Sequence, residues 1–304
     1  MESEALQWLR WSYASRLHDY LKLTDTMTFR TWSLFRKAFP EDVDRHSTFH
    51  VYDRESEGLL SPVVDRLVKL DGDMLTFLRI RIVDMTIDQL VSLNTINTLA
   101  VLTIEIGRND RLGKYRETLT VQRLRDWGRS VSESGAFKKL RVLLIDGCNS
   151  LPTTHVLASI SSFPSLNIVG ISGQPDPSEE EPYLGNWRQH PHLDRWDKTN
   201  SDGGETRSRT TMASDMRRLY DASLELSQDG CPGGETYRSL SMHYIQCSMP
   251  GTATEIAWFV RELKDEPARS VKRVQQDKSR SDTKKRKLRE DKKVSIGSLL
   301  GSFT

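Results

Sequence analysis

Four short apolar segments that share one pattern constrain the fold of this chain more than any other feature of its sequence. Each segment has an apolar residue, two further residues, a second apolar residue, one residue and a last apolar residue. The second apolar positions lie 24, 41 and 26 residues apart. Their β-branched content is typical of buried strands. The four segments are Leu75–Ile80, Leu99–Ile104, Leu140–Ile145 and Leu166–Ile171.

Helix-like segments lie between these strand-like ones, at Ile87–Leu93, Val121–Trp127 and His155–Ile160. Thr86 is the expected N-cap of the first helix, and Thr153 or Thr154 of the third. One strand with one helix has too little apolar area to close a core. We therefore expect neighbouring units to stack, with their strands paired in parallel.

Two of the units resemble repeats of the ribonuclease-inhibitor-like class of leucine-rich-repeat proteins. These units are Gly135–Asn149 and Phe163–Ile171, and Cys148 or Asn149 falls near the Asn/Cys position of that repeat. The chain is also similar to fungal leucine-rich-repeat-like proteins. Two of the three intervals fit the period of about 20–29 residues, and a polar insertion at Gly107–Glu117 fills the longer one. The resemblance implies a short, irregular α/β solenoid of parallel strands and helices that binds proteins.

An ordinary α/β domain is the alternative, because apolar strands separated by helices at about 25 residues also occur in doubly wound sheets. The sequence alone leaves both architectures open.

The chain divides by composition into five parts. Glu41–Glu57 within the first part is charged and is expected to be a loop, while Tyr237–Cys247 and Ile256–Leu263 in the fourth are candidate strands, the latter alternatively a closing helix. Trp187 and Trp196 in the third part dock back on the body or anchor a partner. The parts are a helical N-terminal segment (1–69), the repeat-like α/β core (70–173), a disordered linker or insertion (174–210), a capping segment (211–266) and a disordered basic tail with an apolar end (267–304).

The net charge of +2 hides an asymmetry along the chain. Residues 268–304 hold 12 of the 44 basic and 4 of the 42 acidic residues, so this tail carries +8 and the rest −6. The tail fits a bipartite nuclear import signal, with an import receptor as partner, which predicts a nuclear protein; a cytoplasmic protein is the alternative. A solvated run of charges and a phosphate-binding segment are the other interpretations of the tail. No aromatic residues interleave these charges, which disfavours nucleic acid as a partner. The signal consists of Lys272, Arg273, Lys284, Lys285, Arg286 and Lys287.

A short apolar run follows the basic residues at the end of the chain. Its apolar side chains would share one face of a helix, which predicts a motif that docks in a groove. Folding back onto the body is the alternative. The run consists of Ile296, Leu299, Leu300 and Phe303.

We find no catalytic motif, no cofactor fingerprint and no metal-binding spacing. Cys231 lies in a Gly- and Pro-rich turn, and His190 and His192 lie in a polar loop. No run of 18 apolar residues exists, so no membrane association is expected. The sequence favours a non-enzymatic scaffold or receptor with a protein partner. An α/β enzyme with its site at the carboxyl ends of the strands is the alternative, with Asp84, Asp146 and Cys148 as its candidate residues.

Overall fold

The computed structural model describes eleven stretches of the chain, all within the first of two compact units, Met1–Lys264 and Asp265–Thr304. The following statements concern these stretches. They are residue 6 and residues 8–52, 60–70, 72–83, 85–107, 119–147, 152–172, 183–190, 209–227, 237–246 and 256–262.

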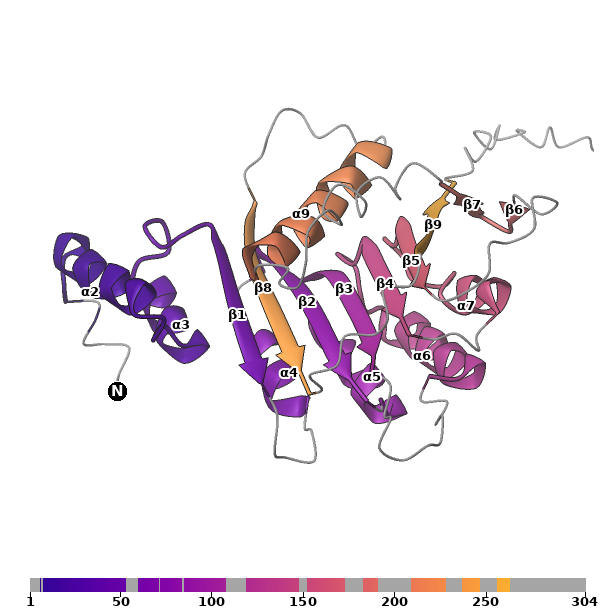
Figure 1. The fold of residues 1–304 in the computed structure, drawn as a ribbon, viewed down its shortest axis with the longest axis horizontal. Coiled ribbons are helices and arrows are strands. Elements are labelled where there is room, and N and C mark those ends of the chain that lie inside the picture. The colour runs from indigo at the N-terminus through magenta and orange to yellow at the C-terminus, as the bar shows by residue number, and fades with distance from the viewer. Residues whose placement is uncertain are drawn as a thin grey trace, which may run out of the picture. The chain divides into compact units, whose positions relative to one another are not determined.

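The described strands form one nine-stranded sheet, in the order β1-β8-β2-β3-β4-β5-β9-β7-β6 (Figure 1). The strands from β1 to β5 in this order pair in parallel, and β9 pairs antiparallel with β5. The expected mixed α/β class is therefore confirmed. The strands are β1 (His46–Tyr52), β2 (Met74–Ile82), β3 (Leu99–Ile106), β4 (Val142–Asp146), β5 (Ile168–Ser172), β6 (Tyr183–Leu184), β7 (Trp187–Gln189), β8 (Arg238–Ile245) and β9 (Ile256–Arg261).

The four apolar segments become β2, β3, β4 and β5, which are neighbours in the order of the sequence. Their apolar positions align across the sheet in two rows whose side chains have no solvent exposure. Burial of each such side chain contributes about 1.5–3 kcal/mol. The rows are Leu78, Leu102, Leu143 and Val169, and next to them Ile80, Ile104, Ile145 and Ile171.

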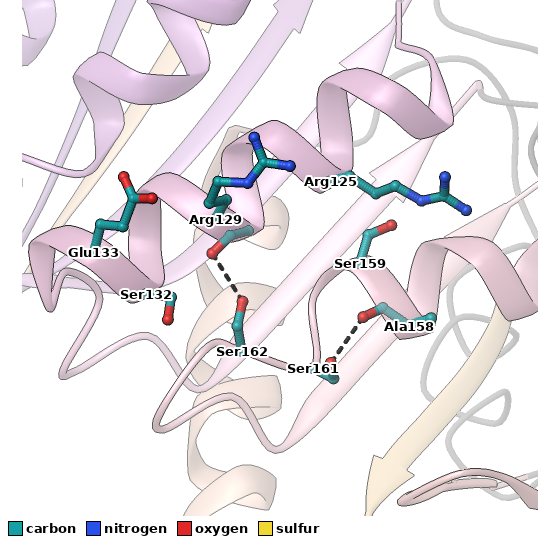
Figure 2. Close-up of a pocket in the computed structure, with 9 residues that line it drawn as sticks. Arg125, Arg129, Ser132, Glu133, Ala158, Ser159, Ser161 and Ser162 are labelled. Atoms are coloured by element: carbon teal, nitrogen blue, oxygen red, sulfur yellow. Dashed lines mark hydrogen bonds between the residues drawn. The ribbon is translucent and has the colours of Figure 1, made fainter. Parts of the chain in front are cut away.

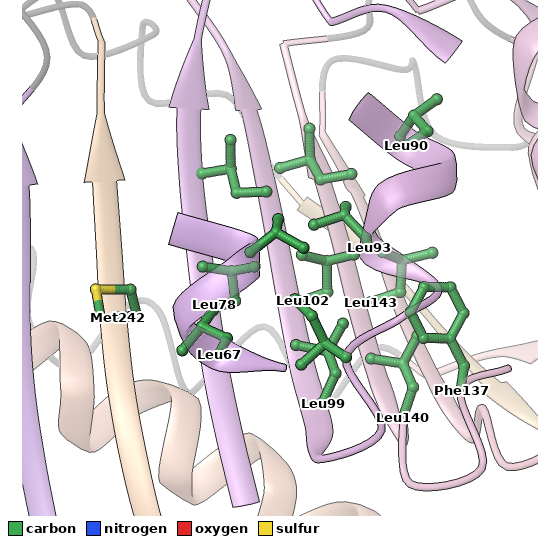
Figure 3. Packing of buried hydrophobic residues seen from close by; sticks show 14 of the residues in the cluster. Leu67, Leu78, Leu90, Leu93, Leu99, Leu102, Phe137, Leu140, Leu143 and Met242 are labelled. Atoms are coloured by element: carbon green, nitrogen blue, oxygen red, sulfur yellow. The ribbon is translucent and has the colours of Figure 1, made fainter. Parts of the chain in front are cut away.

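Four helices cover the face of the sheet that carries these two rows. Their apolar side chains join one buried cluster with the strand residues, as Figure 3 shows for Leu67, Leu90 and Leu93 against Leu78 and Leu102. Each helix contacts the next one along the chain. We call this the helix-covered face. The helices are α4 (Ser61–Leu67), α5 (Ile87–Leu93), α6 (Val121–Ser134) and α7 (Thr153–Ser159).

The opposite face is covered by a single helix, α9 (Arg209–Leu226). Met216, Leu219 and Tyr220 of α9 pack on a second apolar cluster that includes Phe77 and Val101. The end of α9 reaches the start of β4, where Arg141 donates to Ser227 Oγ at 2.9 Å. Figure 1 shows α9 at the end of the sheet opposite to the arrowheads of β1, β8 and β2. We call the face of the sheet on which α9 packs, from one end of the strands to the other, the α9 face.

We expected Glu41–Glu57 to be a charged loop, and this is wrong at His46–Tyr52, which form strand β1. Phe49 and Val51 pack against the main apolar cluster, while the alternate side chains of His46, Thr48 and His50 point to the other face. Parallel pairing with β8 provides the backbone partners. A strand with only one apolar face and many polar residues is easily mistaken for a loop in a sequence.

The expected N-terminal helices exist as α2 (Trp11–Leu23) and α3 (Phe29–Ala38). They pack on each other through aromatic contacts, with the rings of His18 and Phe35 centred 5.3 Å apart. Phe29 and Trp32 of α3 contact Phe49 of β1.

One of the two predicted helix caps is confirmed. Thr86 forms a capping box with Gln89 at the start of α5. The prediction for α7 is wrong, because that helix begins at Thr153 and its N-cap is Pro152, which offers no side-chain hydrogen bond. Proline suits a helix start because its φ is already fixed near the helical value.

The segment expected to be a disordered linker contains the β6–β7 hairpin, which extends the sheet beyond β9. Trp187 is 2% exposed and stacks under the guanidinium of Arg261, 5.2 Å from the ring centre. Arg261 also donates to the carbonyl oxygen of Phe163 at 2.7 Å. Burial of this tryptophan explains why the hairpin is ordered, and Trp187 therefore docks on the body.

The two candidate strands of the capping segment are both strands, but they lie at different places. β9 closes the β5 edge, whereas β8 lies between β1 and β2. Within the described residues, no helix has both the length and the apolar character needed to cross a membrane.

Candidate functional site

The strands carry ionisable side chains on the α9 face, at their carboxyl ends. Side chains alternate between the two faces of a strand, so the positions between the buried Leu and Ile residues point away from α4–α7. Parallel register places these positions in two rows, which we call the polar rows. We call the row farther from the carboxyl ends of the strands the lower row and the row at those ends the upper row. The lower row is His50, His243, Arg79 and Thr103, and the upper row is Arg81, Glu105, Asp146 and Ser172.

The lower row begins with two stacked imidazoles. His50 of β1 and His243 of β8 are register partners, and their ring centres are 4.6 Å apart at an interplanar angle of 27°. Arg79 of β2 is the next register partner of His243. Three nitrogen-rich side chains therefore lie next to one another on three adjacent strands.

A shared carboxylate links the two rows. Glu105 accepts from Arg81 Nε at 2.7 Å through Oε2 and pairs with Arg79 through Oε1. The side chains of both arginines are 16% exposed and that of Glu105 12%. One acid between two partly buried guanidinium groups leaves these three side chains with one positive charge.

The far end of the upper row is acidic and tightly bonded. Ser172 Oγ donates to Asp146 Oδ1 and accepts from the backbone N–H of Gly147 at 3.0 Å. Gly147 has a φ of +84°, and a Cβ there would lie 2.3 Å from the carbonyl oxygen of Ile106. Glycine is required at this position, because it lets the end of β4 approach β3 and holds the Asp146–Ser172 pair in place.

Burial, first, and then the positive charges of His50, Arg79 and Arg81 lower the pKa of His243 to about 3. His243 is therefore neutral at physiological pH. Its Nε2 is buried and finds no hydrogen-bond partner within the part of the chain that the structure describes.

A second polar cluster lies at the amino ends of the strands. His46 Nδ1 and Ser239 Oγ are 2.8 Å apart, and Tyr237 donates its hydroxyl to Asp221 of α9 at 2.7 Å. Burial raises the pKa of Tyr237, and the hydrogen bond to Asp221 raises it further. Because Ser239 is 1% exposed, a substrate cannot reach its hydroxyl. The cluster fastens α9 to β8.

A pocket of about 390 Å³ lies on the helix-covered face, between α6 and α7 (Figure 2). The hydroxyls of Ser159, Ser161 and Ser162 each donate to a backbone carbonyl, Ser162 to that of Gly128. A Cβ at Gly128 would lie 2.2 Å from the carbonyl oxygen of Ser159. Close packing of the two helices therefore accounts for these residues without a ligand.

Most sequence-predicted site residues lie outside the described residues. These are the six of the import signal, the four of the terminal apolar run, Asp84, Cys148, Asn149, Cys231, His192 and Trp196. Asp146 is described and belongs to the upper polar row. In the described stretches, no three His, Cys, Asp or Glu side chains are grouped so that they could hold a metal ion.

Sequence reasoning missed the polar rows, although part of the signal is visible. Arg79 and Arg81 alternate with Ile80 and Ile82, and Glu105 separates Ile104 from Ile106. A charge at every second position of an otherwise apolar strand indicates a face that α-helices do not cover. The partners His50 and His243 could not be found this way, because β1 and β8 are distant in sequence.

The chain matches no protein-family model, and neither a curated protein nor a solved structure is found to be similar to it.

Proposed function

We propose that the chain is a non-enzymatic protein-binding protein, a scaffold or receptor, and that its partner binds on the polar rows. One observation carries this proposal. On the α9 face, in-register ionisable side chains lie at the carboxyl ends of neighbouring strands, beyond the apolar cluster on which α9 packs. The side chains of Arg79, Arg81 and Glu105 there keep 12–16% of their surface exposed. Arginine and tyrosine are common among the residues that dominate binding energy in interfaces. Arg81 lies in the upper row, and Tyr52, 47% exposed, stacks beside His50.

We further propose that β2–β5 with α4–α7 are a short, irregular leucine-rich-repeat-like solenoid. Consecutive strand order and the position of all the connecting helices α4–α7 on one face support it, because a doubly wound sheet has its connecting helices on both faces and a reversal of strand order. In this architecture the strand face opposite the helices is an extended binding surface. The departure is α9, which occupies the amino-end half of that face.

The enzyme alternative has less support. The only serine in the polar rows, Ser172, is fully buried and bonds to Asp146. Nothing in the rows combines an accessible nucleophile with a base, which a nucleophilic mechanism needs. Asp84 and Cys148 lie outside the described residues.

Alanine variants test the binding surface. The full chain is used to recover bound proteins, which are quantified by mass spectrometry, with wild type, Tyr52→Ala/Arg81→Ala and Arg129→Ala compared. Arg79 still pairs with Glu105 in the double variant, and Arg129 of α6 is a matched arginine on the helix-covered face with a side chain 67% exposed. We expect at least about a tenfold loss of specific partners in the double variant only, the effect of removing interface anchors. Equal recovery from all three folded proteins would reject the proposal.

We propose nuclear localisation through Lys272, Arg273 and Lys284–Lys287, bound by an import receptor. Cationic residues in two groups separated by ten residues support this. Replacing Lys284–Lys287 by alanines should move a fluorescent fusion from the nucleus to the cytoplasm, and an unchanged distribution would discard the import signal. The groove-docking role of Ile296, Leu299, Leu300 and Phe303 stays a prediction.

A further inference from the structure

Helix α2 exposes large apolar side chains along one side. Tyr13, Leu17 and Tyr20 are 63%, 46% and 61% exposed. Their spacing of four and three residues places them within about 60° of one another around the helix. Leu9 just before the helix and Leu23 in its last turn continue the row and are also exposed. We call these five residues the α2 stripe.

The opposite side of α2 is already used for packing within the protein. Ala14 and His18 are buried against α3, and Trp11 contacts Phe39 with ring centres 5.1 Å apart. The packing of α2 on α3 therefore does not use the side chains of the stripe. Exposed apolar side chains gathered on one helix side mark interaction sites.

Basic side chains border the stripe. Arg16 is three residues after Tyr13 and four before Tyr20, so it lies beside both rings. Arg10 precedes the first helical turn. Both arginines are exposed, and among the described residues neither forms an ion pair with an acid. The exposed acid of α2, Asp19, is 3.5 Å from Nδ1 of His18.

We propose that the α2 stripe docks a partner protein segment whose apolar helix face is bordered by acidic side chains. Charge complementarity selects this occupant. The apolar face would cover Tyr13, Leu17 and Tyr20, and its carboxylates would meet Arg10 and Arg16, for which guanidinium groups are suited by bidentate geometry. This surface is separate from the polar rows, so the protein would hold two partners or two parts of one.

The same charges disfavour the other occupants. A second copy of α2 would bring the same positive charges, Arg10 and Arg16, beside its stripe and not carboxylates, and the tail at 268–304 carries +8. A helix lying on an anionic membrane has a solvated polar side opposite its apolar side, whereas that side of α2 is packed against α3.

Site-specific photo-crosslinking in the full-length protein tests the proposal. A benzophenone amino acid replaces Tyr13, and in a matched control it replaces Val91, an exposed apolar residue of α5. The crosslinked peptide is sequenced after irradiation in the cells that make the protein. The measurement is repeated with Arg10→Glu/Arg16→Glu, whose thermal unfolding should match the wild type because both arginines are exposed.

We expect one main crosslinked peptide at position 13, with apolar residues at helical spacing and flanking Asp or Glu, and little at position 91. Its yield should fall at least about tenfold with the double charge reversal, as for lost charge pairs at an interface. Crosslinks to a second copy, to residues 268–304 or to a peptide without flanking acids would overturn the proposal, as would yields no higher than at position 91. A different result would be a protein that sediments with phosphatidylserine vesicles in a way that requires Arg10 and Arg16, and that gives no protein crosslink. That result would show that the stripe binds a membrane and would overturn the proposal.

Discussion

The two faces of the sheet differ in how their composition changes along the strands. The helix-covered face is apolar from one end to the other, with Leu78 and then Ile80 on β2 and equivalent residues on β3, β4 and β5. The α9 face is apolar under α9, at Phe77 and Val101, and again at Leu144 and Trp258, and becomes charged towards the carboxyl ends of β2 and β3 at Arg81 and Glu105.

If the polar rows bind a partner as proposed, this difference separates stability from binding within single strands. Apolar side chains stabilise the fold in proportion to the area they bury. An Arg–Glu–Arg cluster at 12–16% exposure stabilises little compared with an apolar replacement, because desolvation offsets most of the attraction. The binding role that we propose for the polar rows gives these charges a reason to be retained that does not depend on stability.

The largest loss of stability should come from the helix-covered face. Leu102→Ala removes a fully buried side chain between Leu78 and Leu143, and should lower the free energy of unfolding by about 2–5 kcal/mol. Chemical denaturation measures it, with Val91→Ala of α5 as the exposed control, which should change by less than about 0.5 kcal/mol. Equal effects of the two variants would contradict the core assignment.

Removing the shared acid of the polar rows should cost less. Glu105→Ala leaves Arg81 without its ion pair in a partly buried site, and we expect a loss of roughly 1–3 kcal/mol. The control is Asp126→Ala, which breaks the exposed pair between Asp126 and Arg129 at 3.7 Å and should cost about 0–1 kcal/mol. If the two substitutions cost the same, the rows are no more buried than the helix surface.

The free energy of unfolding should depend on pH because His243 is buried. The unfolded His243 takes up a proton near pH 6.5, whereas the folded one resists protonation down to about pH 3. The free energy of unfolding should therefore fall with pH below about 6.5, by up to about 1.4 kcal/mol per pH unit from this group. His243→Phe, which keeps a ring beside His50, should give a shallower dependence between about pH 6 and 4.5. Parallel curves for the two proteins would show that His243 titrates normally.

The smallest effect concerns the covered half of the α9 face. Tyr237→Phe removes the hydroxyl that donates to Asp221, and should lower the free energy of unfolding by about 0.5–1.5 kcal/mol. Partner recovery should be unchanged, because α9 and Tyr237 lie away from the polar rows. Loss of the partner in this variant would instead extend the binding surface to α9.

The sequence predicts the central array well because its signals are local. The shared pattern at Leu99–Ile104 and Leu140–Ile145 specifies strands, and the intervening helices are amphipathic. Adjacent units pair with each other, so β2–β5 follow in order. β8 could not be placed between β1 and β2, because its partners His46–Tyr52 lie nearly 200 residues earlier and no local pattern encodes parallel register over that separation.

The polar rows escape prediction for the same reason. Arg79 and Glu105 are visible as charges within strands, but their neighbours His50 and His243 come together only through the β1–β8–β2 pairing. Trp187 shows the converse case, in which a polar, Pro- and Gly-rich sequence conceals an ordered hairpin because one buried aromatic ring and Arg261 hold it.

Apolar replacement of Arg79, Arg81 and Glu105 tests most directly whether the polar rows bind a partner protein. In Arg79→Met/Arg81→Met/Glu105→Leu, the thermal unfolding temperature and the recovery of bound proteins are measured on the same preparation. We expect a folded variant that unfolds at or above the wild-type temperature and recovers none of the specific partners. A variant that fails to fold would show that these charges stabilise the sheet. A variant that keeps its partners would show that the charges do not bind them, and either result contradicts the proposal.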